Sequence, residues 1–224
     1  MERTKDINAN PRVRKAILLI FLFHLVGLAG FYIPILQPFF YQLVPWHLLI
    51  MFVIIGYSHR TMNQDFWVFT GMIFLIGFAA EWIGVHKGWL FGSYTYGETL
   101  GIKADGIPLT IGVVWFLVVY STGVLMQYSR IKYALIRVIV GAGILVGLDK
   151  LIEPIAIKFD YWHWDWHEIP VQNYVAWFIV SVILLKFYYA LGLKQQKYIG
   201  VTMFASQLIF FVVLYMTTGT NIFA

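Results

Sequence analysis

The sequence predicts an all-α protein: a polytopic membrane helix bundle with about seven transmembrane helices. Hydrophobic residues make up 60% of the 224 residues, only 12% are charged, and the mean hydropathy is +0.75. A soluble domain carries roughly twice that share of charged residues. A water-soluble core of this size cannot hide so many apolar residues, so lipid must solvate many of them. We expect one integral membrane domain covering residues 1–224.

Seven apolar segments follow one another along the chain, and each is a candidate membrane helix. The bilayer offers no water to satisfy backbone polar groups, so each segment should be helical. The second is short and lies among three prolines, which makes its boundary the least certain. In chain order the segments cover about 14–34, 43–57, 66–86, 107–127, 133–153, 172–191 and 198–217.

Basic residues predict the orientation of these helices. With seven spans, the N-terminal segment and alternate loops carry most of the Lys and Arg: Arg3, Lys5, Arg12, Arg14, Lys15, Arg60, Arg130, Lys132, Arg137, Lys194 and Lys197. The opposite loops hold only Lys87, Lys103 and Lys158. The positive-inside rule then predicts a multi-pass protein of the cell (inner) membrane, with a cytoplasmic N-terminus and an extracytoplasmic C-terminus. We interpret the first apolar segment as a retained helix, not a cleaved signal peptide.

Acidic residues collect on the opposite side from the basic ones. Two large connections, 86–106 and 154–171, are also rich in aromatic residues. The acids in or beside them are Glu81, Glu98, Asp105, Asp149, Glu153, Asp160, Asp165 and Glu168. Any chemistry is therefore expected at this face.

Glu81 lies near the end of the third apolar segment. The residues after it, 82–85, continue the apolar pattern, so Glu81 should lie below the membrane surface. A charge near the bilayer centre costs roughly 2.5–3.5 kcal/mol on insertion scales, which makes an intramembrane acid a functional candidate. An ion pair is the alternative explanation.

Asp149 and Glu153 end the fifth apolar segment. Four residues apart on a helix, they share one face, with Cβ atoms about 5–6 Å apart. Two such carboxylates repel, so one tends to keep its proton, and a protonated carboxyl group can act as a general acid. The alternative is a structural pair with Lys150 or Lys158. Three preceding glycines on this helix permit close helix contact: Gly141, Gly143 and Gly147.

The stretch DYWHWDWHEIP, residues 160–170, fits a metal site, a catalytic site or an anchor at the membrane surface. A metal site here would require an extended stretch, or a helical spacing that brings the two histidines together. Its ligands would be His163, Asp165 and His167, with His86 as a further candidate. No second clear ligand pair is present, so we expect no metal, and we expect the tryptophans to lie in the interface and close over a pocket. The other histidines look incidental: His24, His47 and His59.

Several classes of function are excluded by composition. There is no cysteine, which removes disulfides, thiol chemistry and thiolate-bound metals. The net charge of +5 comes from short clusters between apolar segments, so we expect no nucleic-acid partner. The glycines of residues 86–108 are not a dinucleotide fingerprint, because no strand precedes them. A retinal-type photoreceptor is discarded because the last apolar segment has no lysine and Lys186 is the only mid-span lysine.

Three segments together resemble the carotenoid biosynthesis membrane protein family, whose members include carotenoid 1,2-hydratases. They are EWIGVHKGWLFGSYTYGETLG, GIPLTIGVVWFLVVYS and LDKLIEPIAIKFDYWHWDWHEIPVQNYVAWF, and the resemblance covers about 78–185. Leu90, Ser93 and Gly112 stand where the family pattern has proline, and these departures affect the shape of the pocket.

The resemblance implies addition of water to the terminal C1=C2 double bond of an acyclic carotenoid end. Protonation at C2 leaves a tertiary cation at C1, which water captures, and no cofactor is needed. Asp149 and Glu153 would be the acid pair, and Glu81 the base or water-orienting group. Expected substrate-binding residues are Trp82, Trp89, Phe91, Tyr94, Tyr96, Trp115, Tyr161, Trp162 and Asn173. Groups expected to help water or protons enter are His86, His163, Asp165 and His167.

Two alternatives fit the same residues. A carotenoid end-group cyclase or isomerase begins with the same protonation but then loses a proton. A carotenoid-binding or transport protein would perform no reaction, and its acids would be ion-paired. In all cases the expected partners are a lipophilic carotenoid and the lipid bilayer, and other carotenoid-pathway enzymes are candidate partners.

Overall fold

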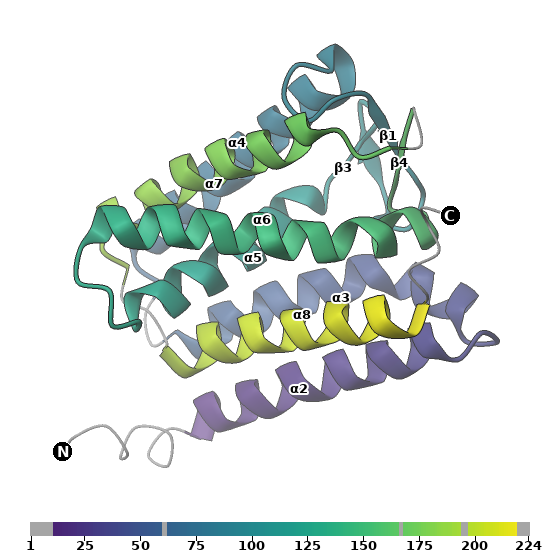
Figure 1. The fold of residues 1–224 in the computed structure, drawn as a ribbon. Helices are drawn as coiled ribbons and strands as arrows, with labels where there is room; N and C mark the ends of the chain where they lie inside the picture. Colours follow the sequence, from purple (N-terminus) through teal and green to yellow (C-terminus); the bar gives the residue numbers. More distant parts are fainter. Residues whose placement is uncertain (1–10, 60–61, 166–167, 194–196, 219–224) are drawn as a thin grey trace.

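The computed structural model describes residues 11–59, 62–165, 168–193 and 197–218, and this part of the chain forms seven α-helices. They are α2 (Pro11–Tyr32), α3 (Gln37–Ser58), α4 (Gln64–Lys87), α5 (Ile111–Gln127), α6 (Ala134–Lys158), α7 (Val171–Ala190) and α8 (Lys197–Thr218). Each helix coincides with one predicted apolar segment, so the prediction of a helix bundle is confirmed (Figure 1).

The largest differences from the predicted boundaries occur at prolines. Helix α3 begins at Gln37, ahead of the expected start, and contains Pro45. Its Pro38 lies in the first turn, where a missing N–H leaves no hydrogen bond unmade. Helix α6 continues through Pro154 to Lys158. Both shifts lengthen a helix beyond its purely apolar stretch.

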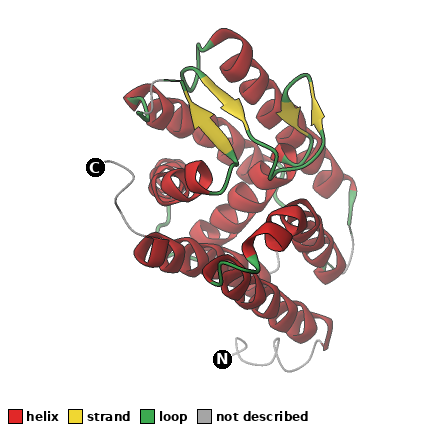
Figure 2. Ribbon diagram, turned by 90° about the vertical axis from the view of Figure 1, so that its right-hand side faces the viewer, coloured by secondary structure: helices red, strands yellow, loops and turns green. Residues whose placement is uncertain are grey.

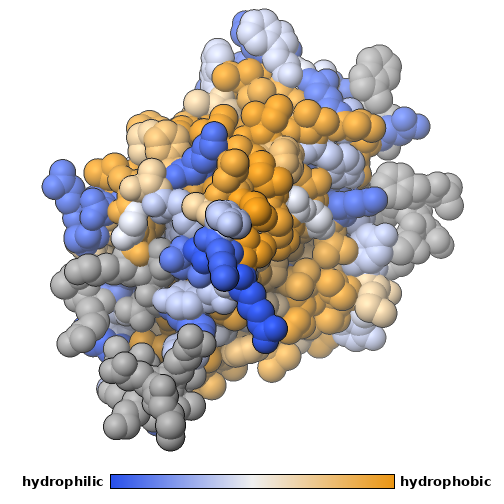
Figure 3. All heavy atoms as spheres, turned by 60° about the vertical axis from the view of Figure 1, so that its left-hand side comes forward, coloured by the Kyte–Doolittle hydropathy of each residue, from blue (hydrophilic) through white to orange (hydrophobic). Residues whose placement is uncertain are grey.

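Five of the described helices, α2, α3, α4, α7 and α8, are long and apolar enough to cross a membrane. Helix α5 is apolar but has 17 residues, and α6 carries five charged side chains along its 25 residues. The chain is a multi-pass membrane helix bundle. Much of the face seen in Figure 3 is hydrophobic, with hydrophilic side chains grouped in patches.

Helix α5 lies at the centre of the bundle. Nearly all its side chains are buried, as expected for a helix that is apolar on every side, and it contacts α3, α4, α6, α7 and α8. Helix α2 packs at the outside, against α3 and α8 (Figure 1). On α6, a Cβ at Gly141 would meet Leu185 at 2.9 Å, whereas nothing lies within 4 Å at Gly143 or Gly147. The expected close helix contact therefore applies to Gly141 alone.

Short strands join the two long connections at one end of the bundle. Strand β1 (Tyr94–Tyr96) pairs antiparallel with β4 (Trp162–Trp164), with Tyr94 opposite Trp164 and Tyr96 opposite Trp162. Strand β2 (Lys103–Ala104) pairs with β3 (Ile107–Pro108). Figure 2 looks onto this end and shows both ribbons. The two acid-rich connections thus lie on the same side, as the sequence indicated, but the all-α prediction contained no strands.

Hydrogen bonds at Gly97 and Asp160 join these two connections beyond the strand pair. The Gly97 N–H donates to the Tyr161 carbonyl at 2.9 Å, and the Glu98 N–H donates to Asp160 Oδ2 at 2.9 Å. Partial burial would raise the pKa of Asp160, but the Glu98 N–H and the neighbouring His163 hold that pKa below its usual value. Asp160 therefore remains an acceptor for this contact at neutral pH.

Gly97→Ala should loosen this end of the protein. A Cβ at Gly97 would lie 2.2 Å from the Asp160 carbonyl oxygen, which is backbone and cannot move alone. Overpacking of this kind costs about 1–3 kcal/mol, and we expect a lower unfolding temperature and faster proteolysis within 88–110. Gly143→Ala, with no atom nearby, is the matched control and should leave both unchanged. Equal behaviour of the two variants would contradict the tight approach.

Candidate active site

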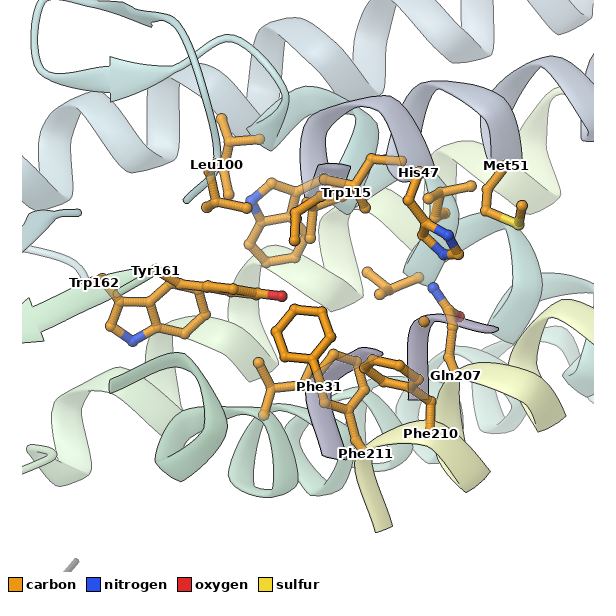
Figure 4. Close-up of a pocket in the computed structure, with 18 of the residues that line it drawn as sticks. Phe31, His47, Met51, Leu100, Trp115, Tyr161, Trp162, Gln207, Phe210 and Phe211 are labelled. Carbon is orange, nitrogen blue, oxygen red and sulfur yellow. The ribbon is translucent and has the colours of Figure 1, made fainter. Parts of the chain in front are cut away.

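A cavity of about 450 Å³ opens inside the bundle next to the β1–β4 ribbon. Its walls are mainly aromatic and aliphatic, and Figure 4 shows Tyr161 and Trp162 at one end with Phe31, Trp115 and Phe210 beyond them. Two carboxylates, Glu81 and Glu153, are part of the lining. The cavity therefore joins an apolar interior to a small acidic end.

Glu81 of α4 is held by three hydrogen-bond donors. Its Oε2 accepts from the Tyr94 hydroxyl at 2.5 Å and the Tyr96 hydroxyl at 2.7 Å. Its Oε1 accepts from Trp115 Nε1 at 2.9 Å. Burial raises the pKa of both tyrosines well above the usual value, so both phenols keep their protons.

Two glycines on α4 make room for these donors. Gly77 and Gly84 lie four residues before and three after Glu81, which places all three on one helix face. A Cβ at Gly77 would meet Trp115 at 2.7 Å, and one at Gly84 would meet the Tyr94 hydroxyl at 2.8 Å. The two glycines of the sequence GFAAEWIG therefore leave the space in which aromatic donors reach the carboxylate.

Glu153 of α6 is also held by three donors. Its Oε2 accepts from Trp162 Nε1 at 3.0 Å and Trp164 Nε1 at 2.9 Å. Its Oε1 accepts from the amide nitrogen of Asn173, on α7, at 3.0 Å. All three donors are N–H groups, which cannot accept a proton in return.

Asp149 lies behind Glu153 and is 0% exposed. The amide nitrogen of Asn173 reaches Asp149 Oδ2 at 2.9 Å as well as Glu153, so one side chain bridges both acids. Asp149 Oδ1 is buried without a hydrogen-bond partner among the described residues, and Asp149 does not line the cavity. Spacing alone correctly grouped the two acids on one face, but only Glu153 reaches the cavity.

Positive charge does not balance these acids within the described residues. The ion pairs found there join His86 to Asp105, Lys103 to Glu98, and His163 to Asp160. None of these three pairs includes Asp149 or Glu153, so they do not support the alternative in which a lysine neutralises either acid. The acids are stabilised by N–H and O–H donors instead.

The β1–β4 ribbon explains why both glutamates are held in one place. Side chains two residues apart in a strand share a face, so Tyr94 and Tyr96 point together at Glu81, and Trp162 and Trp164 at Glu153. Across the strands, the Tyr94 and Trp164 rings lie 5.2 Å apart. One face of the ribbon thus covers the acidic end of the cavity.

Most of the residues expected to bind substrate line this cavity: Phe91, Tyr94, Tyr96, Trp115, Tyr161, Trp162 and Asn173. Trp82 and Trp89 do not. Trp82 stacks on His86 and donates to Asp105 at 2.7 Å, and Trp89 is 74% exposed. Neighbours in a helix face different ways, which is why Trp82 cannot follow Glu81 into the cavity.

Three of the residues expected to help water or protons enter, His86, His163 and Asp165, lie outside the cavity lining. His86 pairs with Asp105 at 3.3 Å, and His163 pairs with Asp160 at 2.6 Å. The Asp165 N–H donates to the Ser93 carbonyl. His167 lies outside the described residues. Within those residues, no group of three or more acids and histidines could hold a metal ion.

The sequence interpretation missed several cavity residues. Trp164 binds Glu153, and its signal was the period-two spacing from Trp162. Trp177 of α7 stacks on Trp115 with ring centroids 4.3 Å apart, but nothing distinguished it among other apolar helix residues. His24, His47 and Gln207 also line the cavity.

Comparison with known proteins places these residues in a family context. A family model described as carotenoid biosynthesis protein matches residues 40–224. The bisanhydrobacterioruberin hydratase of Haloarcula japonica is 26% identical over 159 residues, which cover 66% of this chain and 54% of that protein. The chain thus spans about half the length of this curated relative. No solved structure matches. The match across most of the chain shows that this protein belongs to the carotenoid biosynthesis protein family.

Proposed function

We propose that this protein is a carotenoid 1,2-hydratase that adds water to the terminal C1=C2 double bond of an acyclic carotenoid end. The observation that carries the proposal is the pair of glutamates, Glu81 and Glu153, fixed at one end of an aromatic cavity. Hydration of an alkene needs an acid, a base and walls that tolerate a cation. The hydratase name of the relative supports the choice of reaction.

Glu81 is the proposed acid. Its partners Tyr94 and Tyr96 carry hydroxyl groups, which can donate or accept, so Glu81 can hold a proton without leaving a hydrogen bond unmade. Glu153 is the proposed base, because its three N–H donors favour the ionised carboxylate. This assignment changes the roles expected from sequence, in which Asp149 and Glu153 formed the acid pair.

Asp149 is proposed to keep Glu153 ionised without touching the substrate. The charges of these two acids interact with each other and with Glu81, and neighbouring buried carboxylates repel strongly when all are ionised. A proton on Asp149 Oδ1, the oxygen without a partner among the described residues, relieves that repulsion. Asp149 Oδ2 remains the acceptor for Asn173.

Hydration proceeds by protonation of the alkene and then capture of the cation by water. Glu81 gives its proton to C2, the π electrons form the new C–H bond, and C1 becomes a tertiary cation. Water attacks C1, Glu153 takes the water proton, and that proton returns to Glu81 before the next cycle. Ring faces of Trp115 and Trp162 stabilise the cation, an interaction worth about 2 kcal/mol when desolvated.

The substrate is proposed to enter sideways from the bilayer. An apolar cavity of roughly 150 Å³ holds one benzene, so a cavity three times larger holds on the order of twenty carbons, about half of a carotenoid. Three cavity residues on α2 and α3 are also exposed: Val26 by 46%, Phe39 by 60% and Trp46 by 63%. The rest of the polyene therefore extends between these helices into lipid, while water arrives at the ribbon end.

Expression in a host that accumulates lycopene tests the proposal. We expect pigments that gain one water per modified end, measured by mass spectrometry of extracts. An isomer of unchanged mass would instead identify a cyclase or isomerase, and unchanged pigment on the purified protein would identify a binding or transport protein. Either result would overturn the hydratase assignment.

We further propose that residues 1–224 act as one domain of the cell membrane with a cytoplasmic N-terminus. The basic residues of the loop between α5 and α6, Arg130 and Lys132, support this orientation, because Lys and Arg are enriched in cytoplasmic loops. Cysteines introduced singly at Ser129 and Thr95, in the otherwise cysteine-free chain, would report the side of each loop by labelling with an impermeant thiol reagent.

A further inference from the structure

Three polar side chains meet at the other end of the cavity, away from Trp162 and the glutamate it binds. His24 of α2, His47 of α3 and Gln207 of α8 all belong to the lining. The two imidazole rings have centroids 4.9 Å apart. Figure 4 shows His47 and Gln207 pointing into the same end of the cavity, with Tyr161 and Trp162 at the opposite end.

This cluster has hydrogen-bonding capacity that the described residues do not use. His24 Nδ1 lies 2.8 Å from the Ile20 carbonyl, which only accepts, so Nδ1 donates and Nε2 is left as an acceptor. Gln207 Oε1 accepts from Ser121 at 3.2 Å, and its amide N–H groups have no acceptor among the described residues. His24 and Gln207 are each 8% exposed. Buried polar groups are costly unless they are hydrogen-bonded, and in membrane proteins they mark ligand sites by default.

The surroundings of the cluster determine what kind of group it can bind. No carboxylate lies within ion-pair distance of either imidazole in the described part of the chain, and the neighbouring walls are apolar, including Phe23, Met51 and Phe210. A charged ligand group would stay unpaired there. A carbonyl would satisfy the amide donor but not the imidazole acceptor, whereas a hydroxyl both accepts and donates.

We propose that His24, His47 and Gln207 form a binding subsite for a hydroxyl group on the isoprenoid chain of the ligand. The amide N–H of Gln207 donates to the hydroxyl oxygen, and an imidazole nitrogen accepts its hydrogen. The subsite makes the protein prefer hydroxylated acyclic carotenoids over pure hydrocarbons. The subsite rests on the proposed function in one respect only, which is that the isoprenoid ligand is a carotenoid. Part of it lies on α2, outside the residues that the family model matches.

Pigment binding to the purified full-length protein tests the subsite without turnover. The Glu81→Gln background prevents conversion. The probes are lycopene, an acyclic carotenoid alcohol whose hydroxyl lies within about twenty carbons of an unreacted end, and the fully hydrated pigment, each titrated by quenching of tryptophan fluorescence. Two hydrogen bonds to a neutral group predict about tenfold tighter binding of the hydroxylated probe. His47→Phe and, separately, Gln207→Met should bring the two affinities together while lycopene binding is unchanged. Met51→Leu, which alters only the apolar wall, should keep the preference.

The hydroxyl has two possible sources, and the probes distinguish them. A preference for a carotenoid that carries a hydroxyl together with an unreacted end indicates selection of substrate. A preference confined to the fully hydrated pigment indicates retention of product. Equal affinities in the parent protein, or a preference unaltered in both variants, would overturn the subsite. Failure of the hydratase assay would leave this binding result standing, so the two proposals fail separately.

Discussion

Glu153→Gln should lower carotenoid hydration by about 10²- to 10⁴-fold, the usual contribution of a positioned acid or base. Glutamine has the same shape but cannot take the proton of the attacking water. Glutamine also cannot accept hydrogen bonds at both ends of its amide. When its oxygen accepts from Trp162 and Trp164, its NH₂ group faces the NH₂ group of Asn173, so two donors meet without an acceptor. We therefore expect normal pigment binding and very little product.

The matched control is Glu98→Gln. Glu98 is a carboxylate of the same end of the protein, with a side chain 86% exposed and paired to Lys103, and its loss should leave conversion unchanged. Product per unit of membrane-inserted protein, measured by mass spectrometry of pigments, compares the variants. Retention of a third or more of the parental conversion in Glu153→Gln would remove this residue from the mechanism.

Much of the fold was predictable because the bilayer leaves few choices. An apolar segment in lipid must satisfy its own backbone, so each of the seven segments corresponds to one of the seven helices in the described part of the chain. The same physics singled out Glu81, Asp149 and Glu153, since a carboxylate is rarely placed within such a segment without a purpose. Which of them faces the cavity depends on helix rotation, which spacing does not give.

Contacts between the connections were not predictable in the same way. Strands β1 and β4 have three residues each and lie far apart in the sequence, and no pattern specified that Tyr94 would pair with Trp164. The stretch DYWHWDWHEIP nevertheless carried a signal in its alternation. As a strand, it points Trp162 and Trp164 at Glu153 and leaves His163 on the other face with Asp160. His163, which seemed suited to a metal, is thereby separated from the indoles that bind the acid.

Asn173→Leu should damage both stability and activity, because one amide serves two buried acids. Asn173 is 2% exposed, and its removal leaves Asp149 Oδ2 and Glu153 Oε1 without this donor. An unsatisfied buried polar group costs about 1–3 kcal/mol, so we expect a lower unfolding temperature in detergent. Conversion should fall by about tenfold or more, because the lost donor no longer favours ionised Glu153.

The double variant Asp149→Leu/Asn173→Leu separates these two effects. Replacing both partners of a hydrogen bond by apolar groups can be nearly neutral, so the double variant should recover part of the lost stability. Conversion should stay low, because Glu153 keeps its indole donors but not the amide that orients Oε1. If stability and conversion recovered together, Asn173 would be a packing residue. If neither single nor double variant changed either property, the bridge between the acids would have no role. We expect stability to recover while conversion stays low. That result would show that Asn173 positions the base Glu153 and does not merely fill space between α6 and α7.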